Sequence, residues 1–359
     1  MKKIVVLSLI SVFVFTCLQA ADLEETLESL SGEAAESYVS PIVSAFGTNL
    51  NGGWFHWAPK DKLFGLDVEF GMVLMSTMFP DDDKSFDATG AFQFNQNQAE
   101  NIVENSGISS GDYGYDELVS AIMSQEFEIG IHGATIIGEE DDHVMLEFPE
   151  QTVTVDIGGS PQDFDLLAYS QDSGVGGLLD DYSMLPLGAP QLSIGTIYGT
   201  KAAFRFVPSL DIEDLGKFDY FGFGVQHNPK AWLKVPIPID LCFSYFTQTM
   251  KLGDIVEANA TAFGLNVSKT FGASFLSVTP YAGYMLESSN MKFKYSYELG
   301  TDPISGTPLD PMEIKFDIDG KNKSRLTLGT TFRLGVFNIN ADYNIGKYNS
   351  FTAGFALGF

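Results

Sequence analysis

The sequence predicts an all-β protein, an antiparallel up-and-down transmembrane β-barrel of about 12–14 strands with a short N-terminal helix and plug and a long acidic insertion. Residues 323–359 form three alternating strand-like runs. From residue 191 onward, further alternating runs recur at regular spacing. Beyond the N-terminal region, the sequence lacks the ~18 unbroken apolar residues that a membrane helix needs, so its hydrophobicity is spread over alternating strands.

The strongest signal is the alternation in residues 323–359, where apolar residues exchange with polar residues or glycine. A period of two places each set on one face of a strand, and about ten residues suffice for a tilted membrane-crossing strand. We expect the polar face to line the barrel lumen. An alternative is that these side chains only satisfy one another and a plug. The predicted lumen-lining residues are Arg325, Arg333, Asn338, Asn340, Asp342 and Asn344.

The last run ends on an aromatic residue and resembles the C-terminal assembly signal of bacterial outer-membrane β-barrels. The residues that carry this resemblance are Phe351, Phe355, Leu357 and Phe359. The resemblance implies two partners, the outer-membrane lipid and the barrel-assembly machinery, and a location in the cell outer membrane.

The N-terminal region agrees with export. Residues 1–20 combine Lys2 and Lys3 with an apolar run and a small residue before the expected cleavage point, as a secretory signal peptide does. Residues 22–37 are expected to form a short helix, and residues 21–60 a plug with Trp54 and Trp57 in an interfacial aromatic belt. A partly ordered leader is the alternative. The mature chain would keep one cysteine, Cys242, and therefore no internal disulfide.

The body of the barrel is expected to span residues 61–359 and to include a loop-rich insertion at residues 96–190. Residues 66–74 predict a first strand and residues 86–95 a second strand that pairs back on it. Within the insertion, residues 101–105 and 116–125 have helical character. The strands expected after it are residues 191–198, 200–207, 218–227, 239–249, 258–269, 275–286, 291–298 and 312–318, followed by the three closing runs.

Charge is distributed unevenly along the chain. Residues 81–200 hold 23 acidic residues and one basic residue, Lys84, whereas residues 201–359 hold 15 of each. This balance argues against nucleic-acid binding, which requires basic side chains on the phosphates. An acidic insertion between barrel strands is typical of extracellular loops or of a constriction in the lumen.

Residues 189–208 (APQLSIGTIYGTKAAFRFVP), residues 218–246 with the turn GVQHNPKAW, and the closing strands together resemble a poorly characterised bacterial family of exported, outer-membrane-type barrel proteins. This resemblance covers about half the chain and implies a barrel fold but no catalytic residues. A looser similarity is to the outer-membrane long-chain fatty-acid transporters, which pair an N-terminal hatch with a barrel. In that comparison, residues 38–59 would be the hatch.

Candidate sites for chemistry are sparse. Residues 107–111 match the G-x-S-x-G pattern around Ser109, but an elbow needs a strand before it and a helix directly after it, so a glycine-serine loop is the better account. The acidic runs 81–83 and 139–142 lack calcium-loop spacing and are interpreted as solvated loops, with bridging of divalent cations as the second interpretation. We therefore expect no cofactor and no enzymatic activity.

The predicted function is that of an outer-membrane β-barrel that passively moves small or hydrophobic solutes, with the acidic region guarding its outer mouth. The alternative is a structural or adhesion barrel with a blocked lumen. A membrane-embedded lipid hydrolase is a remote third possibility.

Overall fold

The computed structural model describes residues 32–359 apart from 213–215, 234–236 and 274. Among these residues, ten antiparallel strands pair side by side, and the pairing of β12 with β14 joins the two ends of the row into a closed ring. The strands in ring order are β12 (Val256–Ser268), β11 (Asp240–Leu252), β10 (Gly216–His227), β9 (Thr200–Ile212), β8 (Met184–Ile197), β1 (Phe64–Met78), β18 (Ser350–Gly358), β17 (Phe337–Ile345), β16 (Ser324–Leu334) and β14 (Leu276–Tyr297).

In the part of the chain that the structure describes, the whole sheet has twelve strands, but its closed ring has ten, so the expectation of about 12–14 barrel strands is wrong for the ring. The predicted runs 275–286 and 291–298 are one long strand, β14. The predicted second strand 86–95 is β2 (Ser85–Phe92), and it pairs with β3 (Phe127–Ala134) outside the ring. The run 312–318 is β15 (Met312–Asp319), which pairs only with the last part of β14. Period-two alternation shows that a segment is a strand, but it does not show which sheet the strand joins.

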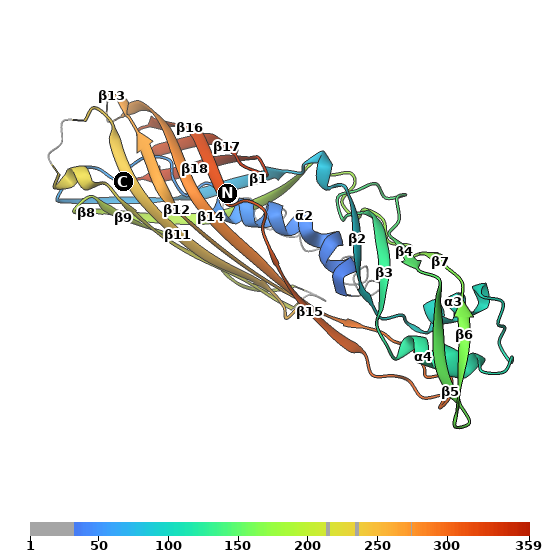
Figure 1. The fold of residues 1–359 in the computed structure, drawn as a ribbon. Helices are drawn as coiled ribbons and strands as arrows, with labels where there is room; N and C mark the ends of the chain where they lie inside the picture. Colours follow the sequence, from blue (N-terminus) through green and yellow to red (C-terminus); the bar gives the residue numbers. More distant parts are fainter. Residues whose placement is uncertain (1–31, 213–215, 234–236, 274) are drawn as a thin grey trace.

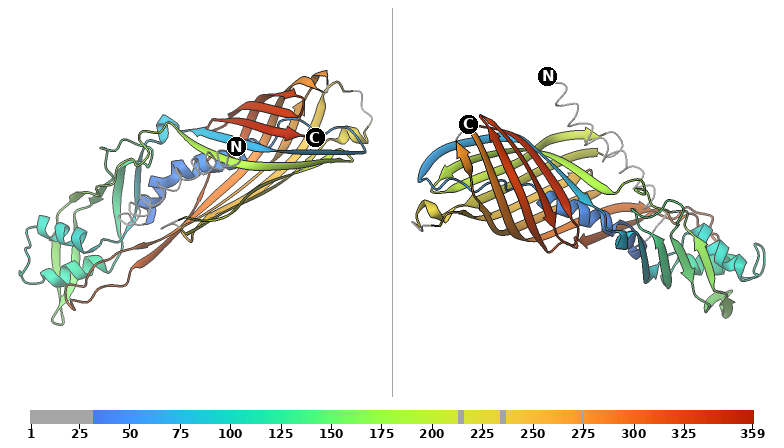
Figure 2. Two further views of the ribbon diagram at one scale, coloured as in Figure 1. Left: turned by 180° about the vertical axis from the view of Figure 1, so that it is seen from behind. Right: turned by 90° about the horizontal axis from the view of Figure 1, so that it is seen from above.

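The two ends of the ring differ. At one end, tight turns join β8 to β9 and β16 to β17. At the other end, the chain leaves the ring after Met78 and returns at Met184, and β14 and β15 extend beyond their neighbours. We call residues 79–183 the head, and the two ends of the ring the head end and the far end. Figures 1 and 2 show an elongated molecule with the ring on one side and the head on the other.

The wall of the ring has apolar side chains outside and polar side chains inside. Outward residues such as Phe221 and Phe355 are 54% and 49% exposed, whereas the inward Arg205 and Gln226 are fully buried. A water-soluble protein buries its large apolar side chains and exposes its charged ones. The ring reverses this rule over most of its length, as the walls of transmembrane barrels do.

The head contains two small sheets and two helices. β2, β3, β4 (Met145–Phe148) and β7 (Tyr169–Asp172) form a four-stranded sheet, and β5 (Gln151–Ile157) and β6 (Ser160–Leu166) form a hairpin. The helices α3 (Gln96–Asn105) and α4 (Tyr115–Met123) lie near the predicted helical stretches and bury Ile102, Val103, Leu118 and Ile122. The short strand β13 (Phe271–Ala273) and the 3-10 turns Asp81–Asp83 and Pro229–Ala231 complete the described elements.

The helix α2 (Gly32–Asn51) connects head and ring (Figures 1 and 2). The sequence predicts a helix at residues 22–37 and a broken segment after it. Residues 22–31 and the predicted signal peptide 1–20 lie outside the described residues, and the described helix continues through Pro41 to Asn51. Its apolar side, including Tyr38, Val39, Val43 and Leu50, is buried in the main core, so packing outweighs the usual helix-breaking effect of proline.

Candidate functional site

Residues 49–59 run inside the ring, and we call them the threaded segment. The helix α2 ends at Asn51, and Gly53 then adopts a φ of 67°, which side-chain-bearing residues rarely adopt. A Cβ atom at Gly53 would lie 2.4 Å from Cγ1 of Val73 on β1. Glycine therefore allows the chain to leave the helix close to the wall.

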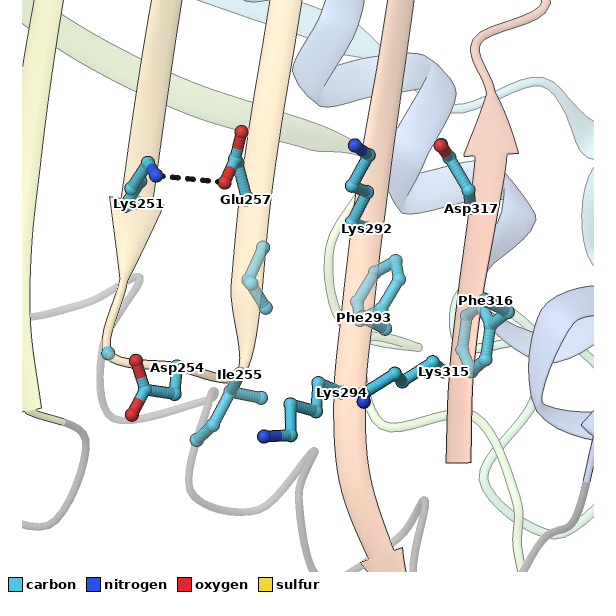
Figure 3. Close-up of a pocket in the computed structure, with 12 residues that line it drawn as sticks. Lys251, Asp254, Ile255, Glu257, Lys292, Phe293, Lys294, Lys315, Phe316 and Asp317 are labelled. Atoms are coloured by element: carbon cyan, nitrogen blue, oxygen red, sulfur yellow. Dashed lines mark ion pairs between the residues drawn. The ribbon is translucent and has the colours of Figure 1, made fainter. Parts of the chain in front are cut away.

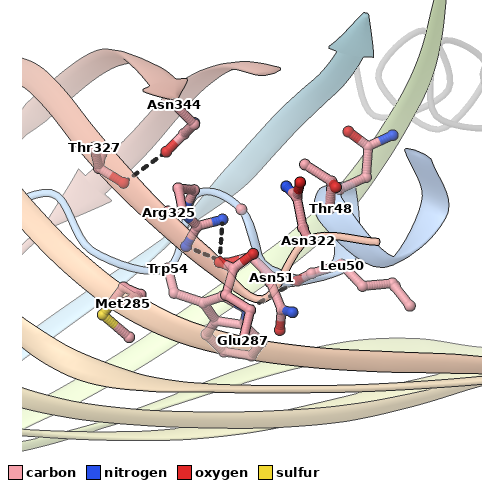
Figure 4. Close-up of polar contacts among 12 residues, drawn as sticks. Thr48, Leu50, Asn51, Trp54, Met285, Glu287, Asn322, Arg325, Thr327 and Asn344 are labelled. Carbon is pink, nitrogen blue, oxygen red and sulfur yellow. Dashed lines mark hydrogen bonds and ion pairs between the residues drawn. The ribbon is translucent and has the colours of Figure 1, made fainter. Parts of the chain in front are cut away.

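Two buried arginines of the wall donate hydrogen bonds to carbonyl groups at the end of α2. Arg205 Nη2 lies 2.8 Å from the Gly52 oxygen. Arg325 Nη2 lies 2.8 Å from the Asn51 oxygen, and Figure 4 shows this second contact. Arg205 Nη1 also lies 3.4 Å from the Leu50 oxygen. The last carbonyl groups of a helix lack partners within the helix, and their burial without partners would cost about 1–3 kcal/mol each. The two arginines satisfy them.

Uncharged wall side chains continue this pattern toward the far end. Gln226 Nε2 donates to the Trp54 oxygen at 3.0 Å, and Thr331 Oγ1 donates to the His56 oxygen at 2.8 Å. Asn228 Nδ2 donates to the Pro59 oxygen at 2.8 Å. Because these donors come from β10, the turn after it and β16, the threaded segment is bonded to well-separated parts of the wall.

Trp54 is the central aromatic residue of the threaded segment. Its ring stacks on Phe246 at a centroid distance of 5.1 Å, and the Arg205 guanidinium lies 4.0 Å from the Trp54 ring centroid. A Cβ atom at Gly222 would lie 2.9 Å from the indole, so β10 approaches Trp54 closely. The prediction that Trp54 lies in an interfacial aromatic belt is wrong. It is 1% exposed inside the ring, because aromatic stacking and the cation-π contact are available there.

Charged groups are also buried against the threaded segment. Arg325 Nη1 lies 3.1 Å from Glu287 Oε1 on β14, and His56 Nε2 lies 2.9 Å from Glu69 Oε2 on β1. Figure 4 shows Arg325 between Glu287 and Asn51. Lys201 is buried with its amine 5.4 Å from the Trp57 ring centroid and without a hydrogen-bond partner among the described residues. Removal of one partner of such a buried ion pair is costly, because the other charge is left uncompensated.

All six predicted lumen-lining residues lie on inward-facing positions of β16 and β17. Arg333 is half-buried and the other five are buried. Several bond to one another, since Asn344 Nδ2 lies 2.7 Å from Asp342 Oδ1 and Arg333 Nε lies 2.9 Å from Asn338 Oδ1. Of the six, Arg325 donates a hydrogen bond to the threaded segment. Whether they line a conducting lumen stays a prediction.

Several residues of the site are not predicted from the sequence, among them Arg205, Gln226 and Glu69. Arg205 stands in the run AAFRF, where it is the only charged residue, and a lone charge on the inner face of a strand is the signal that could have found it. Gln226 and Asn228 lie in the GVQHNPKAW turn, whose sequence indicates only a family resemblance. The partners of these side chains are far away in sequence, so alternation alone cannot reveal them.

The residues of the predicted assembly signal lie on β18 or just after it. Phe351 and Phe355 are exposed on the outer face, Leu357 is half-exposed, and Phe359 exchanges two backbone hydrogen bonds with Val68 of β1. Their role as a signal stays a prediction.

The remaining candidates for chemistry lie in the head. Ser109 lies in the turn between α3 and α4, so it lacks the strand that a nucleophile elbow requires before it. Within residues 32–359 as described, no group of three or more His, Cys, Asp or Glu side chains is placed to hold a metal ion. None of the described helices is long and apolar enough to cross a membrane.

The fold and the site define an all-β protein built on a closed antiparallel ring with an internal segment. The chain belongs to a family of unknown function, DUF6588, whose model matches residues 1–359. No curated protein matches the sequence.

The chain is also similar to solved structures of outer-membrane proteins. A loop-deletion form of OmpT, an outer membrane protein of Vibrio cholerae, shares 13% identity over 82% of this chain and 100% of its own, with a TM-score of 0.23. The β domain of the Bordetella autotransporter BrkA shares 9% identity, with the same coverage and a TM-score of 0.21. OmpF of Salmonella typhi shares 9% identity over 82% of this chain and 97% of its own, with a TM-score of 0.20. These values are too low to carry a functional argument, and the looser similarity to fatty-acid transporters stays a prediction.

Proposed function

We propose that this chain is an outer-membrane β-barrel protein whose lumen is closed by its own threaded segment and whose head extends on the outer side. The observation that carries the proposal is the reversed polarity of the closed ring, with exposed phenylalanines outside and buried arginines, glutamines and asparagines inside. An outer face of exposed apolar side chains is favourable when it lies against lipid. The barrel-assembly machinery and the surrounding lipid are the expected partners.

The contacts of the threaded segment support a closed lumen. Wall side chains bond the carbonyl oxygens of Leu50, Asn51, Gly52, Trp54, His56 and Pro59. If the threaded segment left the ring, all these hydrogen bonds would break. The resting barrel is therefore not a passive pore. The function is then structural or adhesive and works through the acidic head, without catalysis. Long connections face outward in bacterial barrels, which favours an outer position for the head.

A gated transporter is the second candidate, in which the threaded segment moves to admit a small or hydrophobic solute. The observation that favours it is the set of buried polar atoms without hydrogen-bond partners along the segment, including Lys201 Nζ, Gln226 Oε1 and Asn51 Oδ1. Unpartnered buried groups of this kind are costly, which lowers the cost of moving the segment. The divalent cations suggested by the acidic runs would be head ligands in either case.

Membrane insertion is tested first by outer-membrane fractionation and by gels that compare boiled and unboiled samples. The expected result is recovery in the outer-membrane fraction with a heat-dependent shift in migration. Recovery in the soluble periplasmic fraction contradicts the whole proposal.

Planar-bilayer conductance then separates the two candidates. A closed barrel gives no steady conductance as wild type and gains it in Arg205→Gln combined with Arg325→Gln, which weakens both arginine contacts to the segment. The matched control is Arg333→Gln. Arg333 is a half-buried inner-face arginine that donates to Asn338 and contacts the segment through the Trp57 ring instead of a backbone carbonyl. Steady conductance of the wild-type protein contradicts the closed lumen and favours a transporter.

A further inference from the structure

On β11, β12 and β14, the outer face of the ring changes from apolar to polar toward the head end. The change proceeds by rows of side chains that lie opposite one another on these three strands. Paired residues define the rows, since Tyr245 of β11 lies opposite Phe263 of β12, which lies opposite Leu286 of β14. All three side chains are exposed and apolar. This row ends the apolar outer face on these strands.

The next two rows toward the head are neutral and hydrogen-bonding. The first consists of Thr247, Thr261 and Ser288, and the second of Thr249, Asn259 and Asn290. Thr249 Oγ1 donates to Asn259 Oδ1 at 2.8 Å, and the Thr247 and Thr261 hydroxyl oxygens lie 3.3 Å apart. We call these six residues the neutral band.

A charged row follows the neutral band. Lys251 lies opposite Glu257, Glu257 opposite Lys292, and Lys292 opposite Asp317 of β15. Figure 3 shows these four side chains on neighbouring strands, with the 2.9 Å ion pair between Lys251 and Glu257. Each row is two residues from the last, or about 7 Å along a strand.

The inner face changes in the opposite sense over the same stretch. On β14 the inward residues are Glu287 and Ser289 beside the apolar and neutral rows, and then Met291, Phe293 and Tyr295 beside the charged row. On β11 they change from Gln248 to Met250 and Leu252. Beyond the neutral band, the sheet therefore has the polarity of a water-soluble protein.

We propose that the neutral band lies in the polar headgroup layer of the membrane on the head side, and that its hydroxyl and amide groups face the lipid headgroups. Both faces of the sheet change at this level, and the headgroup region is the layer in which an apolar solvent gives way to water. The two neutral rows lie about 7 Å apart along strands tilted by about 40°, so they differ in depth by about 5 Å and fit within a headgroup layer of about 5–8 Å on each side of the membrane. The charged row and the head then stand in water. This inference rests on the proposed membrane location of the ring.

The test uses single cysteines in a Cys242→Ser background, because Cys242 is the free cysteine of the described chain and is buried. The variants Phe263→Cys, Thr261→Cys, Asn259→Cys and Lys292→Cys each receive a nitroxide label and are reconstituted in phosphatidylcholine–phosphatidylglycerol vesicles. The measured quantity is the collision rate of each label with oxygen, which concentrates in lipid, relative to that with a water-soluble nickel chelate. Phe355→Cys on β18 is the lipid-facing control, and Tyr113→Cys in the head is the water-facing control.

The expected result is a stepwise fall of this ratio, with Phe263 equal to the lipid control, Thr261 and Asn259 intermediate, and Lys292 equal to the head control. If Thr261 and Asn259 match the head control, or if Lys292 matches Phe355, the position of the band is wrong while the barrel stands. If Phe263 and Phe355 both match the head control, the ring does not lie in a membrane and the proposed function itself fails.

Discussion

Arg205 combines complete burial with several partners. It bonds to Gln191, to the carbonyl groups of Leu50 and Gly52, and it covers one face of Trp54. Arg205→Met leaves the Gly52 oxygen without its donor, at a cost of about 1–3 kcal/mol, whereas the Leu50 oxygen keeps the Trp54 and Gln248 side chains as donors. We expect a clearly lower urea midpoint of unfolding from detergent micelles. Arg333→Met is the control, since Arg333 is half-buried, and an equal effect of the two substitutions contradicts the importance of the Arg205 contacts.

A pH-dependent contact lies in the head. His143 Nδ1 lies 2.9 Å from Asp172 at the edge where β4 pairs with β7, and this hydrogen bond, aided by the charges of Asp172, Asp141 and Asp142, raises the pKa of His143. A group whose folded-state pKa is raised stabilises below its unfolded pKa of about 6.5, and the contribution is lost as pH rises through the folded value.

We therefore expect the pairing of Met145–Phe148 with β7 to be more protected at low pH than at high pH. Amide exchange of wild type and Asp172→Asn, compared at each pH, isolates this contribution from the intrinsic pH dependence of exchange. The two proteins are compared about one pH unit below and two units above the unfolded His pKa of about 6.5. If the difference in amide protection between wild type and Asp172→Asn is the same at both pH values, the proposed contribution of His143 is wrong.

At the scale of elements, the exit from α2 depends on one glycine. Gly53→Ala meets two costs: an L-residue at positive φ costs about 1–2 kcal/mol, and crowding against Val73 adds about 1–3 kcal/mol. Gly335→Ala in the turn between β16 and β17 is the matched control, because Gly335 has a φ of 61° and open space within 4 Å of the point where a Cβ atom would lie. The urea midpoint should fall further for Gly53→Ala than for Gly335→Ala. Equal shifts would show that the threaded segment accommodates the added methyl group without an extra loss of stability.

The pair formed by Arg325 and Glu287 joins two neighbouring strands and the threaded segment. Removal of one partner leaves an uncompensated buried charge, so Arg325→Met or Glu287→Leu alone should cost about 3–5 kcal/mol. The double variant should recover the part of this loss that comes from the unpaired charge, whereas the Asn51 oxygen stays without its arginine donor. A double-mutant cycle of urea unfolding measures the coupling, and additive losses would mean that the two groups do not interact.

The alternation in residues 323–359 predicts three strands close to their observed limits, because a period of two is a local property. The continuation of α2 over residues 38–51 is not predicted, because its proline and glycine are tolerated through contacts with strands far away in sequence. The strands of the head are hardest to assign to a sheet. β2 pairs with β3, but alternation alone cannot show that these two strands belong to the head and not to the ring. The inner face of β16 and β17 is predictable, but its bonds to residues 49–59 are not.

At the scale of the whole molecule, the apolar outer face of the ring determines whether lipid or water is the favourable environment for it. Phe355→Lys places a charge in the middle of β18 on that face, where it costs about 2–4 kcal/mol if the residue lies near the bilayer midplane. We expect a lower yield of heat-modifiable protein on folding into lipid vesicles. Tyr113→Lys, on an exposed residue of the head, is the control and should fold with the wild-type yield. Equal yields for all three proteins would contradict a lipid-facing wall.

The closing pair of the ring has a consequence for the order of assembly. β1 pairs with β18, so the last contact of the circle joins residues near opposite ends of the chain. Contacts this distant in sequence form late, after most local pairs. Residues 49–59 precede β1 closely and end up enclosed, and after closure they could enter only by threading. The simplest assembly pathway therefore places the internal segment against the open sheet first and seals the seam between β1 and β18 around it last.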